Sequence, residues 1–530
     1  MKKLPIGIQN FKEIIEGDHV YIDKTQYIYN LLNTVKYCFL SRPRRFGKSL
    51  LLDMIAELLS GDKELFKGLL IYNSDYSFTR YPVVRLDMSN IPNKNPDTLE
   101  YALLSELRKL VKKEGLDIDS AEPAILFKDF IENLCHKYNQ RVAVLIDEYD
   151  KPILDHIDDI IIAGQNRKVL RGFYGILKSM DPYLRFTFIT GVSKFSKTSI
   201  FSELNNLKDI TMLAEYAGIC GIPIDCLDEY FGEYIVDLTE HNKFNNYNDA
   251  KAAILAWYDG YSWDGQTKLL NPFSLLNFFF DGRIGSYWYE TGTPGFLIDM
   301  IKKTPESYLS LKKLKITEPV LNTFDIERIE IEPLLFQTGY LTVSKVEETK
   351  GLPIYVLDIP NNEVRDAFSM QIVSALTENG NVRVSQAQME IGSALESGDL
   401  NNVLEILRGL FASIPYELHV NAEAYYHSIF YAVMTLLGFN LDVEVSTSRG
   451  RVDAILQLDG MVYIIEFKYV KCPPSASDEE KETLFDSALT AAIDQINSKG
   501  YIDRFKGSGK TVYKAAFAFL GRDEIEMRIE

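Results

Sequence analysis

Residues 41–50 read SRPRRFGKSL and follow an apolar run, Val35–Leu40, that predicts a strand. A strand, a tight loop and a helix start form the setting in which Gly47, Lys48 and Ser49 hold a phosphate chain. The amides of the first helical turn would meet the polyphosphate. Lys48 would reach the terminal phosphates, and the Ser49 hydroxyl would bind Mg²⁺. This stretch therefore predicts a site for a nucleoside triphosphate.

The loop departs from the general pattern G-x-x-x-x-G-K-[ST], because Arg42 stands where the first glycine is expected. The run Ser49–Leu59 behind the loop predicts the helix that the site needs. A basic loop that contains Gly-Lys-Ser by chance is the alternative, and the loop alone leaves it open.

A second apolar run, Val142–Ile146, is followed directly by Asp147 and Glu148, which predicts a buried parallel strand that ends in two carboxylates. In an NTPase, Asp147 would orient the water shell of Mg²⁺ and Glu148 would polarise the attacking water. Ligands bind at this end of the strands in open α/β sheets. A solvated acidic turn is the alternative, and Asp150, close behind, receives no role.

A further strand, Leu184–Thr190, is predicted beside the strand that ends at Asp147. Thr190 at its tip, or Ser193 just beyond, would be placed to sense a γ-phosphate. A plain strand-end turn explains the same residues. The loop at residues 194–208 is either a switch or a solvated surface loop.

These segments resemble the AAA-ATPase-like family of bacterial and archaeal proteins. The matching segments are Pro5–Ile14, Tyr21–Thr25, Arg42–Leu50, Val142–Pro152 and Ile189–Ser196. RPRRFGKS is the usual form of the loop in that family, so the resemblance implies ATP binding without the first glycine. The residues it implies for nucleotide binding are Arg44, Arg45, Phe46, Gly47, Lys48, Ser49, Leu50 and Asp147. It also implies that Tyr21–Thr25 lies against the nucleotide.

The C-terminal part carries a different set of polar residues. A strand that opens at Gly450–Asp453 is followed by Asp459-Gly460 and by a second apolar run, Met461–Tyr469, which predicts a hairpin. Glu466 and Lys468 are two residues apart and share one face of the second strand. Folding the hairpin brings Asp453 towards that face.

Two carboxylates and a lysine at one place form a hard-oxygen site for Mg²⁺ or Mn²⁺. The metal would polarise a scissile phosphate and lower the pKa of a water, and Lys468 would position that water or stabilise the developing charge. An exposed hairpin with a cross-strand ion pair is the alternative. Few other charges interrupt the strand of Glu466, and an unpaired buried charge is costly, which favours a site.

This region resembles the PD-(D/E)xK nuclease superfamily. The resemblance implies that Asp453 and Glu466 are metal ligands, that Lys468 is the catalytic lysine, and that Gln495 matches the glutamine of the following helix. Val452 stands where the superfamily's name has proline, a position that varies within it.

Three neighbouring segments complete this prediction. Glu423 would match the acidic residue of the superfamily's first helix, and His427 is read as a packing residue on the same helix. Cys472–Glu480 is predicted to be a flexible loop, and Leu484–Ser498 a helix.

At 530 residues the chain exceeds one ordinary domain. The predicted fold class is α/β throughout. The predicted parts are a P-loop NTPase domain with a parallel sheet (1–216), a helical lid with a small mixed or winged-helix-like module (217–410), and a restriction-endonuclease-like nuclease domain (411–530). No apolar run or signal-peptide core marks a membrane or secreted protein, which predicts a cytoplasmic one. Five scattered cysteines fit a reducing compartment and argue against a zinc site.

The net charge of −18 argues against binding nucleic acid through the overall field, so contacts would use local patches. Arg42, Arg44 and Arg45 form one basic group, which phosphate binding explains better. The second group lies near the nuclease-like site and is either a nucleic-acid rim or a solvated face: Lys499, Arg504, Lys506, Lys510 and Lys514.

The leading hypothesis is an ATPase fused to a metal-dependent nuclease, in which the nucleotide state gates access to DNA or RNA. The rival is an ATP-dependent switch or adaptor whose nuclease-like domain binds a partner. The intact set Asp453, Glu466 and Lys468 counts against that rival. A purely structural protein would need both sets of residues to be accidental. No feature predicts an oligomeric state.

Overall fold

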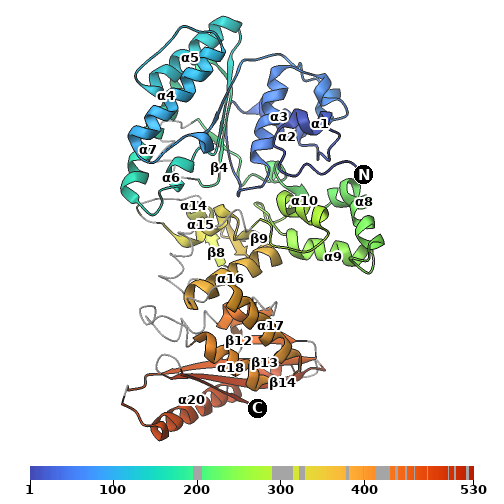
Figure 1. Ribbon diagram of the computed structural model, residues 1–530, viewed down its shortest axis with the longest axis vertical. Coiled ribbons are helices and arrows are strands. Elements are labelled where there is room, and N and C mark those ends of the chain that lie inside the picture. The colour runs from blue at the N-terminus through green and yellow to red at the C-terminus, as the bar shows by residue number, and fades with distance from the viewer. Residues whose placement is uncertain are drawn as a thin grey trace. The chain divides into compact units, whose positions relative to one another are not determined.

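The computed structural model describes residues 1–194, 206–288, 314–321, 327, 329–377, 381–397, 399–411, 430–435, 440–447, 450–458, 460–473, 475–498, 501–505, 509–520 and 524–530. These residues form two compact units (Figure 1). The first holds residues 1–288 and 314–361, and the second holds residues 362–530. The division into three domains at residues 216 and 410 stays a prediction.

A parallel sheet with the strand order β2-β3-β4-β1-β5 forms the centre of the first unit. Its strands are β1 (Tyr37–Ser41), β2 (Val83–Asp87), β3 (Val142–Asp147), β4 (Leu184–Gly191) and β5 (Lys208–Asp209). The strands predicted around the loop and the carboxylates are confirmed, and β1 and β3 are buried along their whole length. Because β4 lies between β1 and β3, its end lies between the loop after β1 and the carboxylates after β3.

Helices cover both faces of this sheet: α4, α5 and α7 on one, and α1, α2 and α3 on the other (Figure 1). They are α1 (Phe11–Glu16), α2 (Thr25–Thr34), α3 (Lys48–Ser60), α4 (Pro96–Lys113), α5 (Pro123–Tyr138), α6 (Lys151–Leu154) and α7 (Ile160–Ser179). Short 3₁₀ helices lie at Glu64–Phe66, Leu70–Asn73, Met88–Asn90, Asp181–Tyr183 and Ala214–Tyr216. Residues four apart on α4, namely Leu99, Leu103 and Leu107, are fully buried, which is the periodicity of a one-sided helix.

The first unit also contains a helical part and a small antiparallel sheet. The helical part comprises α8 (Cys226–Glu240), α9 (Tyr247–Tyr258) and α10 (Pro272–Asp281), with the strand pair β6 (Ile222–Pro223) and β7 (Leu269–Leu270). The small sheet has the order β8-β10-β9, and its elements are β8 (Leu314–Thr317), α14 (Glu318–Leu321), α15 (Ile331–Thr338), β9 (Thr342–Thr349) and β10 (Leu352–Asp358). Asn271 caps the start of α10, because its side chain accepts hydrogen bonds from the amides of Phe273 and Ser274.

The second unit is built on a mixed sheet with the order β11-β12-β13-β14-β15. Its elements are α16 (Asn362–Thr377), α17 (Asn381–Ser397), α18 (Leu400–Phe411), β11 (Asn440–Thr447), β12 (Gly450–Leu458), β13 (Met461–Val470), α20 (Asp478–Ser498), a 3₁₀ helix (Tyr501–Phe505), β14 (Thr511–Leu520) and β15 (Glu524–Ile529). The predicted hairpin is confirmed, with Leu458 opposite Met461. β13 and β14 run parallel because α20 connects them as a crossover.

The predicted loop at Cys472–Glu480 is wrong at its end, because α20 begins at Asp478. Ser477 and Glu480 form a capping box: the Ser477 amide donates to Glu480 Oε2 (2.8 Å), and the Glu480 amide donates to Ser477 Oγ (3.3 Å). This reciprocal pair satisfies amides that a helix start leaves unpaired, and it fixes the start of the helix inside the acidic stretch.

None of the helices that the structure describes combines the length and the apolarity that crossing a bilayer would need.

Candidate functional site

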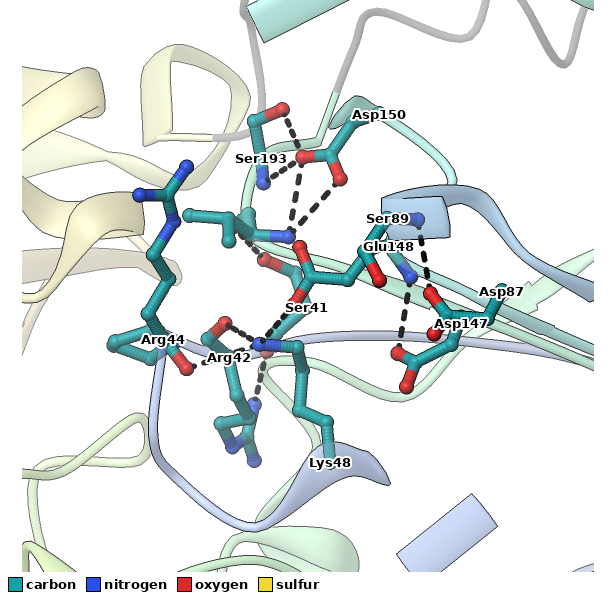
Figure 2. A network of polar contacts seen from close by, with 12 residues as sticks. Ser41, Arg42, Arg44, Lys48, Asp87, Ser89, Asp147, Glu148, Asp150 and Ser193 are labelled. Atoms are coloured by element: carbon teal, nitrogen blue, oxygen red, sulfur yellow. Dashed lines mark hydrogen bonds and ion pairs between the residues drawn. The ribbon is translucent and has the colours of Figure 1, made fainter. Parts of the chain in front are cut away.

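The loop after β1 has the geometry of a phosphate cradle. Gly47 takes φ 93°, in the left-handed region that favours glycine, and α3 begins at the next residue. The amides of the first turn have no partner within the helix and open towards the loop. Lys48 is buried, and its Nζ lies 3.1 Å from the carbonyl oxygens of Arg42 and Pro43 and 3.5 Å from Glu148 Oε1 (Figure 2).

The carboxylates at the end of β3 meet this loop. Asp147 Oδ1 accepts a hydrogen bond from the Glu148 amide (3.0 Å), and the Ser49 hydroxyl is close enough to act on the same carboxylate. Burial raises the pKa of Asp147, while the Ser49 hydroxyl and the Lys48 ammonium act in the opposite direction. Glu148 takes φ 49°, an uncommon value for a residue with a side chain. The structure thus brings Lys48, Ser49, Asp147 and Glu148 together.

A hydroxyl and a carboxylate side by side supply the hard oxygen donors that Mg²⁺ prefers, so Ser49 and Asp147 fit that ion. Within the described residues, no group of three or more His, Cys, Asp or Glu side chains has the arrangement of a ready-made metal site. A Mg²⁺ held by few protein ligands and by substrate phosphates matches this sparse donor set.

Arg42 does not belong to the phosphate site, and its explanation as a phosphate-binding residue is wrong. Its guanidinium is fully buried, donates to the carbonyl oxygens of Ser41 and Thr211 (2.9 Å each), and lies 3.9 Å from the centre of the Trp263 ring. Desolvation lowers its pKa to about 10. Arg42, which stands in place of the first glycine, therefore stabilises the start of the loop through these buried contacts and does not face a phosphate.

The other four residues predicted to bind the nucleotide differ in how far their side chains are exposed. The Arg44 side chain is half-buried, and its carbonyl accepts a hydrogen bond from Trp288 Nε1 (3.0 Å). Arg45 is exposed and lies over the Phe273 ring at 5.1 Å. Phe46 is buried against aromatic rings, and Leu50 is half-buried. The nucleotide-binding roles of these four residues stay predictions.

A mostly apolar cavity of about 100 Å³ lies beside the loop. It is lined by Phe46 and Gly47, by the N-terminal segment with Tyr21 and Lys24, and by residues of the 219–222 segment, α8 and α10. Lys24 donates to the Gly218 carbonyl (2.7 Å), and burial lowers its pKa to about 8. The segment Tyr21–Thr25, predicted to lie against a nucleotide, therefore borders the phosphate loop across this cavity.

The nuclease-like residues also converge. Asp453 Oδ2 accepts from the Phe467 amide (2.8 Å), which places this carboxylate beside Glu466 on the neighbouring strand. Lys468 Nζ lies 3.3 Å from Glu466 Oε1 and 2.9 Å from Gln495 Oε1, and the Gln495 amide donates to Glu466 Oε1.

The chemistry of this second site follows from its burial. Glu466 is 1 % exposed, whereas the side chain of Lys468 is 28 % exposed, so the lysine joins a buried carboxylate to the surface. Two carboxylates from adjacent strands are hard oxygen donors and fit Mg²⁺ or Mn²⁺. Tyr501 was missed from the sequence: burial, then the charges of Glu466 and Asp453, raise its pKa to about 12.

The structure does not place the remaining predicted residues in this site. Glu423, His427, Lys499 and Lys506, and the side chain of Arg504, lie outside the described residues. Lys510 donates to Gln457 Oε1 (3.3 Å), and Lys514 pairs with Glu530 (2.9 Å). Their part in a basic rim stays a prediction.

Two acidic residues of the first site were also missed. Asp87 ends β2 in register with Asp147, and its charge raises the pKa of Asp147 (Figure 2). Asp150 binds the end of β4. The strand-like run before Asp87 could have indicated that this carboxylate ends a strand of the sheet. Nothing in the sequence indicates that Asp150 contacts Val192 and Ser193.

Comparisons with known proteins match both of the regions in which these residues lie. Residues 5–201 match the model of the predicted AAA-ATPase family, and residues 421–528 match that of the PD-(D/E)XK nuclease superfamily. An uncharacterized protein in the vnfD 5′ region of Azotobacter chroococcum mcd 1 is 35% identical over 526 residues, covering 98% of this chain and 96% of that protein. The chain belongs to the AAA-ATPase-like family. Both resemblances read from the sequence are confirmed.

Among solved structures, an Aeropyrum pernix ORC2 protein in ADPNP-ADP complexes matches the AAA-ATPase-like protein with 12% identity and a TM-score of 0.26, over 66% of this chain and 93% of that chain. A TM-score and an identity this low do not show a shared fold. The α/β class of the AAA-ATPase-like protein rests on its own strand order and on the family matches, which join an ATPase-like domain to a nuclease-superfamily domain.

Proposed function

We propose that this AAA-ATPase-like protein hydrolyses ATP with Mg²⁺ and that its C-terminal domain cleaves DNA or RNA with Mg²⁺ or Mn²⁺, under the control of the nucleotide state. The observation that carries the proposal is the contact of Lys468 with both Glu466 and Gln495, beside Asp453. A buried carboxylate held by a lysine and an amide is costly to maintain for packing alone.

In the ATPase site, Lys48 would bind the terminal phosphates once it leaves the carbonyl oxygens that it now contacts. Ser49 and Asp147 would hold Mg²⁺. Glu148, within 3.5 Å of Lys48, would accept the proton of the attacking water. A bound Mg²⁺ would neutralise the charge that develops on the phosphates.

In the nuclease site, Asp453 and Glu466 would hold the metal ion, and Gln495 would keep Glu466 and Lys468 in place. Lys468 would position the attacking water or stabilise the charge on the scissile phosphate. A bound metal would supply Lewis-acid activation of that phosphate. Glu466 is buried, whereas Lys468 is 28% exposed and Asp453 and Gln495 are half-buried, so these three side chains would be the ones to meet the substrate.

The apolar cavity beside Gly47 is proposed to receive the base of the nucleotide, because its walls are mostly apolar and it borders the phosphate loop. Leu276→Trp would fill it from α10. We expect ATP affinity to fall at least about tenfold, while the affinity for inorganic tripolyphosphate stays unchanged, since a missing base contact is worth a few kcal/mol. Calorimetric titration of both ligands measures this.

Phe280→Trp is the matched control for this prediction, because Phe280 lies on the same helix and is 72% exposed. It is expected to bind ATP as the wild type does. An equal loss of tripolyphosphate and ATP binding in Leu276→Trp would show that the cavity does not act as a base pocket.

The proposed function is tested on the full chain with plasmid, single-stranded DNA and RNA, in Mg²⁺ or Mn²⁺, with and without ATP. Cleavage that depends on ATP supports the gated nuclease. Cleavage without ATP dependence supports the nuclease and contradicts the gating. ATP turnover without cleavage of any substrate would support the rival, an ATP-dependent switch or adaptor.

The proposal extends to setting and partners. We place the protein in the cytoplasm of a bacterium, where the free state of all five cysteines would be maintained. Its partners would be ATP and a nucleic acid that contacts local basic residues.

A further inference from the structure

The end of β4 is bound by the elements on both of its sides. The Thr190 carbonyl accepts from the Tyr149 amide (3.1 Å), and the Gly191 carbonyl accepts from the Arg42 amide (3.2 Å). The hydroxyl of Ser41 donates to the Val192 carbonyl. A displacement of this strand end therefore acts on the phosphate loop and on the carboxylate loop at once.

Asp150 makes the densest of these contacts (Figure 2). Its Oδ2 accepts from the Ser193 amide and hydroxyl (2.6 Å each) and from the Val192 amide (3.1 Å). Asp150 is fully buried, and these donors are neutral groups. A Cβ added at Gly191 would lie 2.4 Å from Asp150 Oδ1, so only glycine permits this close approach.

Gln337 on α15 holds the same strand end from another direction. Its Oε1 accepts from the Lys194 amide (2.9 Å), and its Nε2 donates to the Leu321 carbonyl at the end of α14 (2.9 Å). The side chain is 6% exposed, so both bonds are shielded from water. One amide therefore links the residues that follow β4 to the helices of the small sheet.

The residues after Gln337 contact the phosphate loop itself. Gly339 takes φ 94°, and a Cβ there would lie 2.8 Å from the ring of Pro43. The Tyr340 ring packs on Trp288 (5.4 Å), whose indole donates to the Arg44 carbonyl. α15 and the turn behind it therefore touch both the loop that would hold the phosphates and the end of β4.

We propose that Asp150 and Gln337 are positioning residues for ATP hydrolysis, an inference that rests on the proposed ATPase function. Asp150 sets the end of β4 relative to Glu148, which lies two residues before it in the chain. Gln337 couples α14 and α15 to that strand end through its bonds to the Lys194 amide and the Leu321 carbonyl. A small shift of β4 when the terminal phosphate is bound or lost would pass to the small sheet, because packed interfaces shift as units.

The test compares the full-length wild type with Asp150→Asn and Gln337→Leu. Steady-state ATP turnover gives kcat and KM, and hydrogen exchange of residues 331–349 is measured without nucleotide, with ADP and with a non-hydrolysable ATP analogue. Each variant is expected to lower kcat about tenfold or more with KM changed less than about twofold. In the wild type the exchange of α15 should differ between nucleotide states, and in Gln337→Leu it should not.

Two further variants separate positioning from folding. Gln337→Asn keeps both the donor and the acceptor of the amide on a shorter side chain, and it should lower kcat less than Gln337→Leu does. Glu332→Gln changes a half-buried side chain of the same helix and should leave both readouts unchanged.

Three results would overturn the inference. One is a wild-type kcat in Asp150→Asn and Gln337→Leu. Another is a loss of kcat accompanied by an equal rise of KM and a lower melting temperature, which indicates a structural role only. The third is α15 exchange that ignores the nucleotide in a wild type that hydrolyses ATP. A wild type that does not bind ATP would instead refute the proposed function itself, and this inference with it.

Discussion

Glu466→Gln is expected to reduce nucleic-acid cleavage by at least about a hundredfold, since the loss of even an outer partner of a metal ligand typically has effects of this order. The side chain is 1% exposed and bonded to Lys468 and Gln495, so the amide keeps the shape but loses the charge that would hold a metal. ATP turnover should stay at the wild-type rate. Gel assays of cleavage and coupled phosphate release measure the two activities on one preparation.

Asp494→Asn is the matched control for this experiment. It makes the same change from carboxylate to amide one residue before Gln495, at an exposed position of α20, and should leave cleavage intact. Melting curves of both variants exclude unfolding as the cause. Cleavage that persists in Glu466→Gln would mean that the nuclease centre lies elsewhere.

Lys48→Ala is expected to weaken ATP binding about tenfold to a hundredfold, because a hydrogen bond to a charged group contributes about 1.5–3 kcal/mol. Lys48 is buried, and its ammonium contacts the carbonyl oxygens of Arg42 and Pro43 and the Glu148 carboxylate. Phosphate release should fall below detection together with binding. Fluorescence titration with a labelled nucleotide measures affinity independently of turnover.

Glu148→Gln separates the effect on ATP binding from the effect on ATP turnover. It should retain ATP affinity while turnover falls about 10²–10⁴-fold, as expected when a general base is removed. Lys113→Ala is the control, because it removes an exposed lysine in the last turn of α4, outside the phosphate loop. A Lys48→Ala variant that binds ATP as the wild type does would contradict the assignment of the phosphate loop.

Features encoded locally were predictable from the sequence. The strand before Asp147, the loop at Gly47 and the hairpin with Glu466 each follow from apolar runs bounded by turn or polar residues, and the structure has them. The start of α20 was misplaced because the capping box at Ser477 lies in a stretch that also reads as a loop. Propensity alone does not choose between these readings.

Contacts between distant segments could not be predicted. Gln337 reaches Lys194 across 143 residues of sequence, and Trp288 reaches Arg44 across 244. Both lie in apolar stretches that indicate only a core. The inward direction of Arg42 likewise depends on Trp263, far along the chain. Only the fold shows that these side chains meet the phosphate loop.

Two of the three tryptophans of the chain flank that loop: Trp263 lies under Arg42, and Trp288 donates to the Arg44 carbonyl. Two of the three indoles are therefore neighbours of the loop, and the third, Trp257, lies on α9. Nucleotide binding at the loop should therefore change the intrinsic tryptophan fluorescence, and stopped-flow measurements can follow that change in real time without a label.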